Sequence, residues 1–165
     1  MDAEELKALQ KPLKDQYRED PGAALITLRA EGDLGGEVSC SVQTGRALVE
    51  AGLHPASGGD GSLACSGDML LQALVACAGV TMRSVAVNRG MNVTGVVRAE
   101  GDLDFRGTMG VDRDALVGFR DIRLIFDVES DASAEDLDAL IATTERYCVV
   151  LQTLLHSPTI DVSHN

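Results

Sequence analysis

The sequence has few basic residues. It contains 14 Lys and Arg residues against 26 Asp and Glu residues, which gives a formal net charge of −12 at pH 7. Proteins that bind nucleic acids gain much of their affinity from clustered Lys and Arg side chains that displace counterions from the phosphates. A chain with this charge balance is therefore not expected to bind nucleic acid.

Motifs for metals and phosphates are also missing. The four cysteines are Cys40, Cys65, Cys77 and Cys148. None of them forms the Cys-x-x-Cys spacing typical of zinc sites and thioredoxin-like redox sites. The three histidines are His54, His156 and His164, and they are too scattered to suggest a metal site. The segment GGDG at 58–61 lacks the spacing and the lysine of a P-loop and is interpreted as a turn. We expect neither a metal nor an organic cofactor.

Signals for export or for a membrane are absent from the sequence pattern. The first twenty residues lack the cationic start and apolar run of a signal peptide. No stretch reaches the roughly 18 consecutive apolar residues of a spanning helix. We therefore expect a cytoplasmic protein without a membrane partner. In that reducing compartment any disulfide would be transient and chemical rather than structural.

The sequence does contain enough apolar residues for one core. Its 165 residues are 45% hydrophobic and 24% charged, which is typical of a soluble globular protein. Single domains commonly run to about 100–200 residues. We assign residues 1–20 to an N-terminal helical arm and residues 21–165 to a single domain.

The apolar pattern predicts strands interrupted by two long helices. Strands are expected at 24–30, 37–43, 46–52, 92–105, 117–130 and 159–163, with a hairpin turn at 31–36. Helices are expected at 66–90 and from 133 to about 156, the second opened by a capping box of Ser133 and Asp136. This order indicates an α+β fold and argues against a doubly wound nucleotide-binding fold.

Each predicted long helix carries a cysteine toward the core. Cys77 lies in a segment, 69–82, that is apolar nearly all round, and Cys148 lies on an apolar stripe with a 3.6-residue period. A buried cysteine is most often a small packing residue. Two core helices packed about 8–10 Å apart could nevertheless bring these thiols within disulfide distance. The pair is the first candidate for a functional site.

Three segments together resemble the OsmC/Ohr family of thiol peroxidases. They are LLQALVACAGVTM at 70–82, VGFRDIRLIFDVESDASAEDL at 117–137 and TERYCVVLQTL at 144–154. The resemblance covers residue 24 to the end of the sequence. It implies two curved antiparallel sheets around two long central helices. It also implies an intertwined homodimer with active sites near the subunit interface.

The resemblance also implies a reaction. Cys77 would attack the distal oxygen of an organic hydroperoxide and become a sulfenic acid, and Cys148 would condense with it to form a disulfide. A dithiol reductant, often a protein-bound lipoyl group in this family, would then restore the two thiols. No cofactor is implied.

Family members also supply an arginine from the N-terminal hairpin and an acidic residue at the start of the first-cysteine helix. The predicted turn holds no arginine, which leaves Arg29, our preferred candidate, and Arg46; either could equally be a solvated edge residue. The acidic candidate is Asp68, one position later than the family's glutamate. On an ideal helix Asp68 points away from Cys77. It would therefore act across the dimer interface or only complement the helix N-terminus.

Two other interpretations stay open. The chain could be a non-enzymatic dimer of the same fold that senses redox state or binds a small ligand, since the hairpin turn lacks an arginine. Alternatively, both thiols could be packing atoms. Cys40 is expected in the core, and Cys65 is expected in a loop, where it could be oxidised if exposed.

Overall fold

The computed structural model describes residues 2–5, 8, 10–11, 19, 31–34, 39–44, 47–110 and 112–164, with the backbone alone at 31–34, 39–44 and 47–48. Its internal contacts divide the chain into two units. The first unit comprises Met1–Leu9, Ala73–Arg98 and Leu124–Asn165. The second unit comprises Gln10–Gln72 and Ala99–Arg123. The predicted boundary between an arm and a domain near residue 20 lies outside the described residues.

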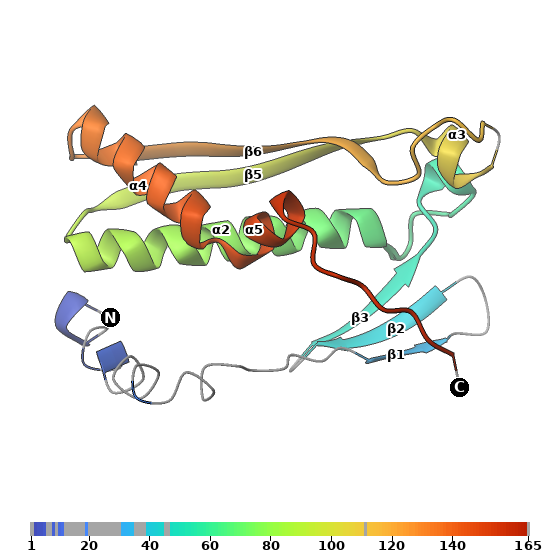
Figure 1. The fold of residues 1–165 in the computed structure, drawn as a ribbon, viewed down its shortest axis with the longest axis horizontal. Coiled ribbons are helices and arrows are strands. Elements are labelled where there is room, and N and C mark those ends of the chain that lie inside the picture. The colour runs from blue at the N-terminus through green and yellow to red at the C-terminus, as the bar shows by residue number, and fades with distance from the viewer. Residues whose placement is uncertain are drawn as a thin grey trace. The chain divides into compact units, whose positions relative to one another are not determined.

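Strands and helices follow one another in the mixed order that the sequence predicts (Figure 1). The strands are β1 (Glu31–Leu34), β2 (Ser39–Thr44), β3 (Ala47–Gly52), β4 (Ala64–Cys65), β5 (Val93–Leu103) and β6 (Phe119–Ser130). The helices are η2 (Pro55–Ser57), α2 (Ser66–Arg89), α3 (Phe105–Thr108), α4 (Ala134–Tyr147) and α5 (Val149–Leu155). The α+β class is confirmed.

A four-stranded sheet with the order β1-β2-β3-β4 lies in the second unit. β1 pairs antiparallel with β2, from Glu31 opposite Gln43 to Leu34 opposite Cys40. The prediction of a turn at 31–36 was therefore wrong for 31–34. Its Gly and Asp residues are typical of turns, but their backbone joins the ladder with β2. The expected strand at 24–30 lies outside the described residues.

The long strands β5 and β6 form a second sheet and match their predicted ranges within two residues at each end. In the first unit Arg98 forms an ion pair with Asp127 at 2.7 Å. In the second unit Arg123 forms one with Asp102 at 2.6 Å. Later residues of β6 thus face earlier residues of β5, which is the antiparallel arrangement that the sequence predicts.

Helix α2 forms the core of the first unit with α4 and β5. Met82, Ala86, Val93 and Leu140 are buried together. The helix ends at Arg89 because Gly90 adopts a left-handed φ of 68° and closes the last turn. The amide of Met91 donates to the Ala86 carbonyl at 2.9 Å and that of Gly90 to the Val87 carbonyl at 3.1 Å, the pattern of a Schellman motif.

Among the described residues, α2 is the one helix long and apolar enough to cross a membrane by length and composition. This criterion averages hydropathy over the helix, whereas Gln72, Thr81 and Arg83 keep α2 from holding 18 consecutive apolar residues. The core helix of a soluble protein meets the same criterion, since core helices and membrane-spanning helices are both apolar on most sides.

The chain after His156 forms neither helix nor strand as far as residue 164. The predicted strand at 159–163 is therefore wrong. The apolar residues Ile160 and Val162 are 76% and 92% exposed, so no neighbouring strand provides a ladder for this segment within the described chain.

Gly95 should tolerate no side chain. Its φ is 128°, and an added Cβ would collide with the Asp127 carbonyl on β6 and lie 2.7 Å from the Cα of Val128. We expect Gly95→Ala to lower the free energy of unfolding by about 2 kcal/mol or more, measured by urea denaturation. Gly118→Ala is the control, because a Cβ there meets nothing within 4 Å. Equal stability of the two variants would contradict this account of the β5–β6 pairing.

Candidate active site around Cys77 and Cys148

The second cysteine lies at a break between two helices. We predicted one helix from 133 to about 156 with Cys148 in its middle, and this was wrong. Ser133 caps α4 as expected, accepting from the amide of Asp136 at 3.1 Å. The helix then ends at Tyr147, because Cys148 has an extended backbone with a ψ of 103°, and α5 begins at Val149.

Three hydrogen bonds define the break. The amide of Cys148 donates to the Thr144 carbonyl at 2.9 Å, and the amide of Gln152 donates to the Cys148 carbonyl at 2.9 Å. Between them, the carbonyl of Glu145 accepts from the side-chain amide of Gln152 at 2.9 Å. In an unbroken helix the Val149 amide would fill that place. The first amides of α5 are therefore free to donate elsewhere.

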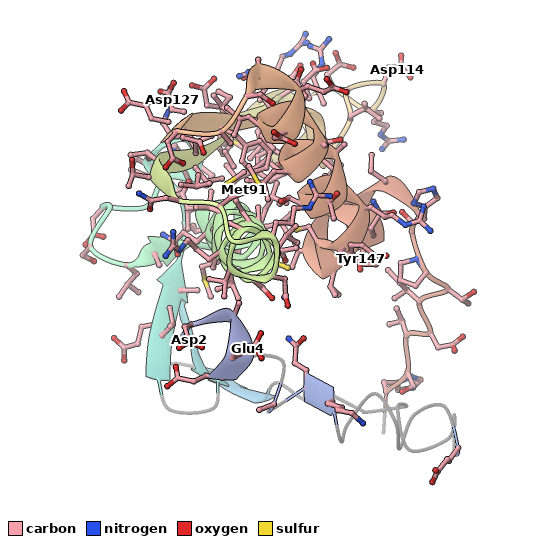
Figure 2. The ribbon with its side chains drawn as sticks, turned by 90° about the vertical axis from the view of Figure 1, so that its left-hand side faces the viewer. Asp2, Glu4, Met91, Asp114, Asp127 and Tyr147 are labelled. Atoms are coloured by element: carbon pink, nitrogen blue, oxygen red, sulfur yellow. The ribbon has the colours of Figure 1, made fainter. Side chains whose placement is uncertain are left out.

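Those amides are directed at sulfur atoms. The backbone N–H groups of Val150 and Val149, and the thiol of Cys148, form hydrogen bonds with the Cys77 side chain from α2. Cys148 is completely buried, whereas Cys77 is half-buried. The ribbons of α4 and α5 lie beside α2 in Figure 1 and again in Figure 2, which looks along α2 past Met91 and labels Tyr147 just before the break. The structure thus brings the two predicted cysteines together within the first unit.

The environment of Cys77 favours its thiolate. Burial raises the pKa of Cys77, but hydrogen bonds from the Val150 amide, the Cys148 thiol and the Val149 amide outweigh it and hold the pKa below its usual value of 9.0. The Thr81 hydroxyl also lies within reach of the sulfur. This hydroxyl has one proton. It can donate that proton either to the Cys77 carbonyl, which lies at 2.8 Å, or to the sulfur, but not to both at once.

Cys148 has the opposite tendency. Burial raises its pKa above 9.0, and the hydrogen bond to Cys77 and the charge of the Cys77 thiolate raise it further, although the Leu151 amide opposes this. Cys77 is therefore the more acidic of the two thiols and loses its proton first, while Cys148 keeps its proton to higher pH. Cys77 is therefore the thiol of the pair that can act as a nucleophile at lower pH.

Alkylation should distinguish the two thiols. At pH 7.5 we expect iodoacetamide to modify Cys77 well before Cys148, because the thiolate is the reactive form and Cys148 is both protonated and buried. Quenching at intervals and mapping the labelled peptides by mass spectrometry measures the order. Labelling of Cys148 ahead of Cys77 would contradict the assignment of the charge.

The predicted arginines lie outside the described residues, so Arg29 and Arg46 keep their status as predictions. Among the described residues, the groups that lower the pKa of Cys77 are uncharged amide, thiol and hydroxyl donors. The sequence search for a cation near Cys77 thus missed backbone donors. No residue-type signal could have revealed them, because they arise from the backbone break.

Asp68 lies in the second unit, in the first turn of α2, and is exposed. It lines a cavity of about 320 Å³, a volume suited to a small ligand. The lining residues are His54, Cys65, Gly67, Asp68, Leu71, Gly101, Asp102, Leu103, Phe105 and Phe119. The structure therefore places Asp68 beside Cys65 and His54, two residues to which the sequence analysis assigned no shared role.

Two interactions order this cavity. The His54 ring stacks on Phe105 with 5.0 Å between ring centroids, and its Nδ1 accepts from the Ala56 amide at 3.0 Å. Arg123 donates to both carboxylate oxygens of Asp102, at 2.6 and 3.0 Å, and this hydrogen bonding lowers the pKa of Asp102. Within the described part of the chain, no three His, Cys, Asp or Glu side chains are grouped closely enough to hold a metal ion.

No curated protein matches the sequence. The fold resembles an OsmC-like protein from Mycoplasma pneumoniae at 17% identity, with a TM-score of 0.67, covering 80% of this chain and 89% of that one. It also resembles an organic hydroperoxide resistance protein OsmC from Legionella pneumophila, described as a predicted redox protein, at 17% identity, with a TM-score of 0.59, covering 80% and 91%.

A third similar structure is the organic hydroperoxide resistance protein OhrB of Bacillus subtilis, at 16% identity, with a TM-score of 0.52, covering 80% of this chain and 93% of that one. At these identities the likeness extends to the fold alone. The sequence model of the OsmC-like proteins matches residues 59–163, a range that contains both cysteines and the helix break. The chain therefore belongs to the OsmC-like protein family.

Proposed function

We propose that this protein is a cysteine-based peroxidase that reduces organic hydroperoxides. The observation that carries the proposal is the hydrogen-bonded pair of Cys77 and Cys148, in which the pKa of Cys77 is lowered and that of Cys148 is raised. Membership of the OsmC-like family supports it, as do the names of the Legionella and Bacillus proteins of similar fold.

The first step forms a sulfur–oxygen bond. The Cys77 thiolate attacks the distal oxygen of the hydroperoxide, the O–O bond breaks, and the alkoxide leaves and takes a proton to become an alcohol. Cys77 is thereby oxidised to a sulfenic acid, and the peroxide is reduced. The amides of Val149 and Val150 stabilise the thiolate before the attack, because they donate to the sulfur.

The second step joins the two sulfurs. The Cys148 sulfur displaces the hydroxyl group of the sulfenic acid, its proton leaves with that group as water, and a Cys77–Cys148 disulfide forms. Cys148 is completely buried and lies next to Cys77, so it is placed to reach the sulfenic acid before an external thiol does. An external dithiol, which in our proposal includes a protein-bound lipoyl group, then reduces the disulfide through a mixed disulfide.

The remaining parts of the proposal concern the dimer. Val80 on α2 and Val149 on α5 are 72% and 71% exposed, although they lie near the two cysteines in sequence. A second copy of the chain would cover such apolar side chains, which supports a homodimer. In that dimer we assign Arg29 to thiolate activation and place Asp68 across the interface. Arg29 lies outside the described residues, and Asp68 is not among the groups that contact Cys77 in the described part of the chain.

A redox sensor is the second candidate. It is favoured by the uncharged surroundings of Cys77 among the described residues, since a sensor needs a disulfide but no rapid turnover. Catalytic turnover with a dithiol separates the two functions. The thiols of a sensor would be oxidised by one equivalent of peroxide and would then stay oxidised.

The test is a stopped-flow comparison of cumene hydroperoxide and hydrogen peroxide. Under excess dihydrolipoamide we expect many turnovers with cumene hydroperoxide and slower consumption of hydrogen peroxide. Consumption of a single equivalent followed by arrest would favour the sensor. No consumption above the rate of dihydrolipoamide alone would exclude a peroxidase.

A further inference from the structure

The residue types around Cys148 do not explain the break between α4 and α5. Neither proline nor glycine occurs in the segment TERYCVVLQTL, so the common breakers of a helix are missing. The hydrogen bonds on either side continue the helical pattern, from Cys148 back to Thr144 and from Gln152 back to Cys148. Between them lie the carbonyls of Glu145, Arg146 and Tyr147, and the first of these has a side-chain donor in place of its usual amide.

Gln152 fills that place from the far side of the break. Its side-chain nitrogen donates to the Glu145 carbonyl at 2.9 Å, seven residues earlier in the chain. In a regular helix the donor would be the amide of Val149, four residues on. The glutamine side chain therefore takes over the hydrogen bond that would otherwise draw Val149 back into α4.

We propose that Gln152 is a positioning residue that holds the helix break open, so that the amides of Val149 and Val150 face Cys77 instead of the carbonyls of α4. The role rests on the proposed function only in so far as Cys77 is the reacting thiol. Gln152 acts on Cys77 through the backbone and touches no reacting atom.

The consequence concerns the acidity of one thiol. Without the side-chain donor, the Glu145 carbonyl recovers the Val149 amide, the helix closes over Cys148, and Cys77 loses a hydrogen bond to its sulfur. Its thiolate then forms at higher pH, because hydrogen bonds to the charged form are what offset its burial. A purely structural role of Gln152 would alter stability without moving this titration.

The experiment measures the pH dependence of Cys77 alkylation in the full chain, with labelled peptides resolved by mass. Gln152→Met keeps the length of the side chain and removes the donor. We expect its Cys77 titration to shift upward by about one pKa unit, which slows alkylation at pH 7 by about tenfold. Gln152→Lys retains an N–H donor of similar reach and should restore the parent titration.

Thr153→Val is the matched control on the same short helix. It removes the hydrogen bond of 2.8 Å from the Thr153 hydroxyl to the Val149 carbonyl but leaves the Glu145 carbonyl untouched. Its Cys77 titration should equal that of the parent. An unchanged titration in a folded Gln152→Met variant would overturn the proposal, as would an equal upward shift in Gln152→Lys or in Thr153→Val.

A measurement on the parent protein keeps the proposal testable even where a variant does not fold. Nuclear Overhauser contacts between the side-chain amide protons of Gln152 and the α-proton of Glu145 are expected, and their absence would refute the bridge. Neither measurement uses a peroxide. If the titration shifts in Gln152→Met but the parent shows no peroxide turnover, the proposed function is refuted and the role of Gln152 still holds.

Discussion

Cys77→Ser should lose the reduction of cumene hydroperoxide by at least about a thousandfold in rate, since the attacking nucleophile is removed. A serine hydroxyl is not ionised at neutral pH even with the donors of Val149, Val150 and Cys148 around it. The oxygen also lacks the polarisable lone pairs that attack peroxides. Steady-state consumption under excess dihydrolipoamide measures the loss.

Cys65→Ser is the matched control for this loss. Cys65 is a half-buried thiol in the second unit, where it lines the cavity beside His54, and the proposed reaction gives it no step. The variant should consume hydroperoxide at the parent rate. A Cys65→Ser variant as slow as Cys77→Ser, or a Cys77→Ser variant as fast as the parent, would move the reaction away from the pair on α2 and the helix break.

Cys148→Ser should halt after one equivalent of hydroperoxide in the absence of added thiol. The serine hydroxyl still donates a hydrogen bond toward Cys77, so the first attack should proceed at a rate within about threefold of the parent. The sulfenic acid then has no partner, because the hydroxyl cannot form a disulfide. We expect it to accumulate and to be trapped by dimedone on the Cys77 peptide.

Quenched-flow sampling with dimedone and peptide mapping measures this arrest. In the parent, trapping should be small, because the adjacent Cys148 thiol competes with dimedone from within the folded chain. Equal trapping in parent and variant would mean that Cys148 does not resolve the intermediate.

Regular elements could be predicted closely from the sequence. The expected helix at 66–90 is α2, Ser66–Arg89, because a long apolar segment is followed by Gly90 at a left-handed position. The strands at 92–105 and 117–130 became β5 and β6 for a similar reason, since alternation persists through each of them. Pattern and backbone agree where one element is long and its ends carry strong signals.

The helix break could not be predicted, because periodicity records side-chain faces rather than backbone dihedrals. The apolar stripe through Leu137, Ile141, Thr144 and Cys148 continues with little interruption into α5, and the hydrogen bonds flanking Cys148 remain helical in spacing. The departures from a regular helix are the extended ψ of Cys148, the amides of Val149 and Val150 that donate to Cys77, and the side chain of Gln152.

The candidate site was predicted in part for the same reason. Cys77 comes from the long helix α2 and Cys148 from the end of α4, on the predicted apolar stripe, and the first unit brings them into hydrogen-bonding contact. The cavity near Asp68 was missed because its residues come from the loop before η2, the two-residue strand β4, the start of α2, and distant positions on β5, α3 and β6. No local pattern joins such residues, since the tertiary fold alone makes them neighbours.

Peptide mapping after a substoichiometric pulse of cumene hydroperoxide tests the central claim most directly. The account predicts that the parent loses two hydrogens per reacted chain and that the new cross-link joins the peptides of Cys77 and Cys148, with Cys65 still a free thiol. Oxidation confined to Cys65, a disulfide that leaves out Cys77 or Cys148, or no reaction of either would contradict it.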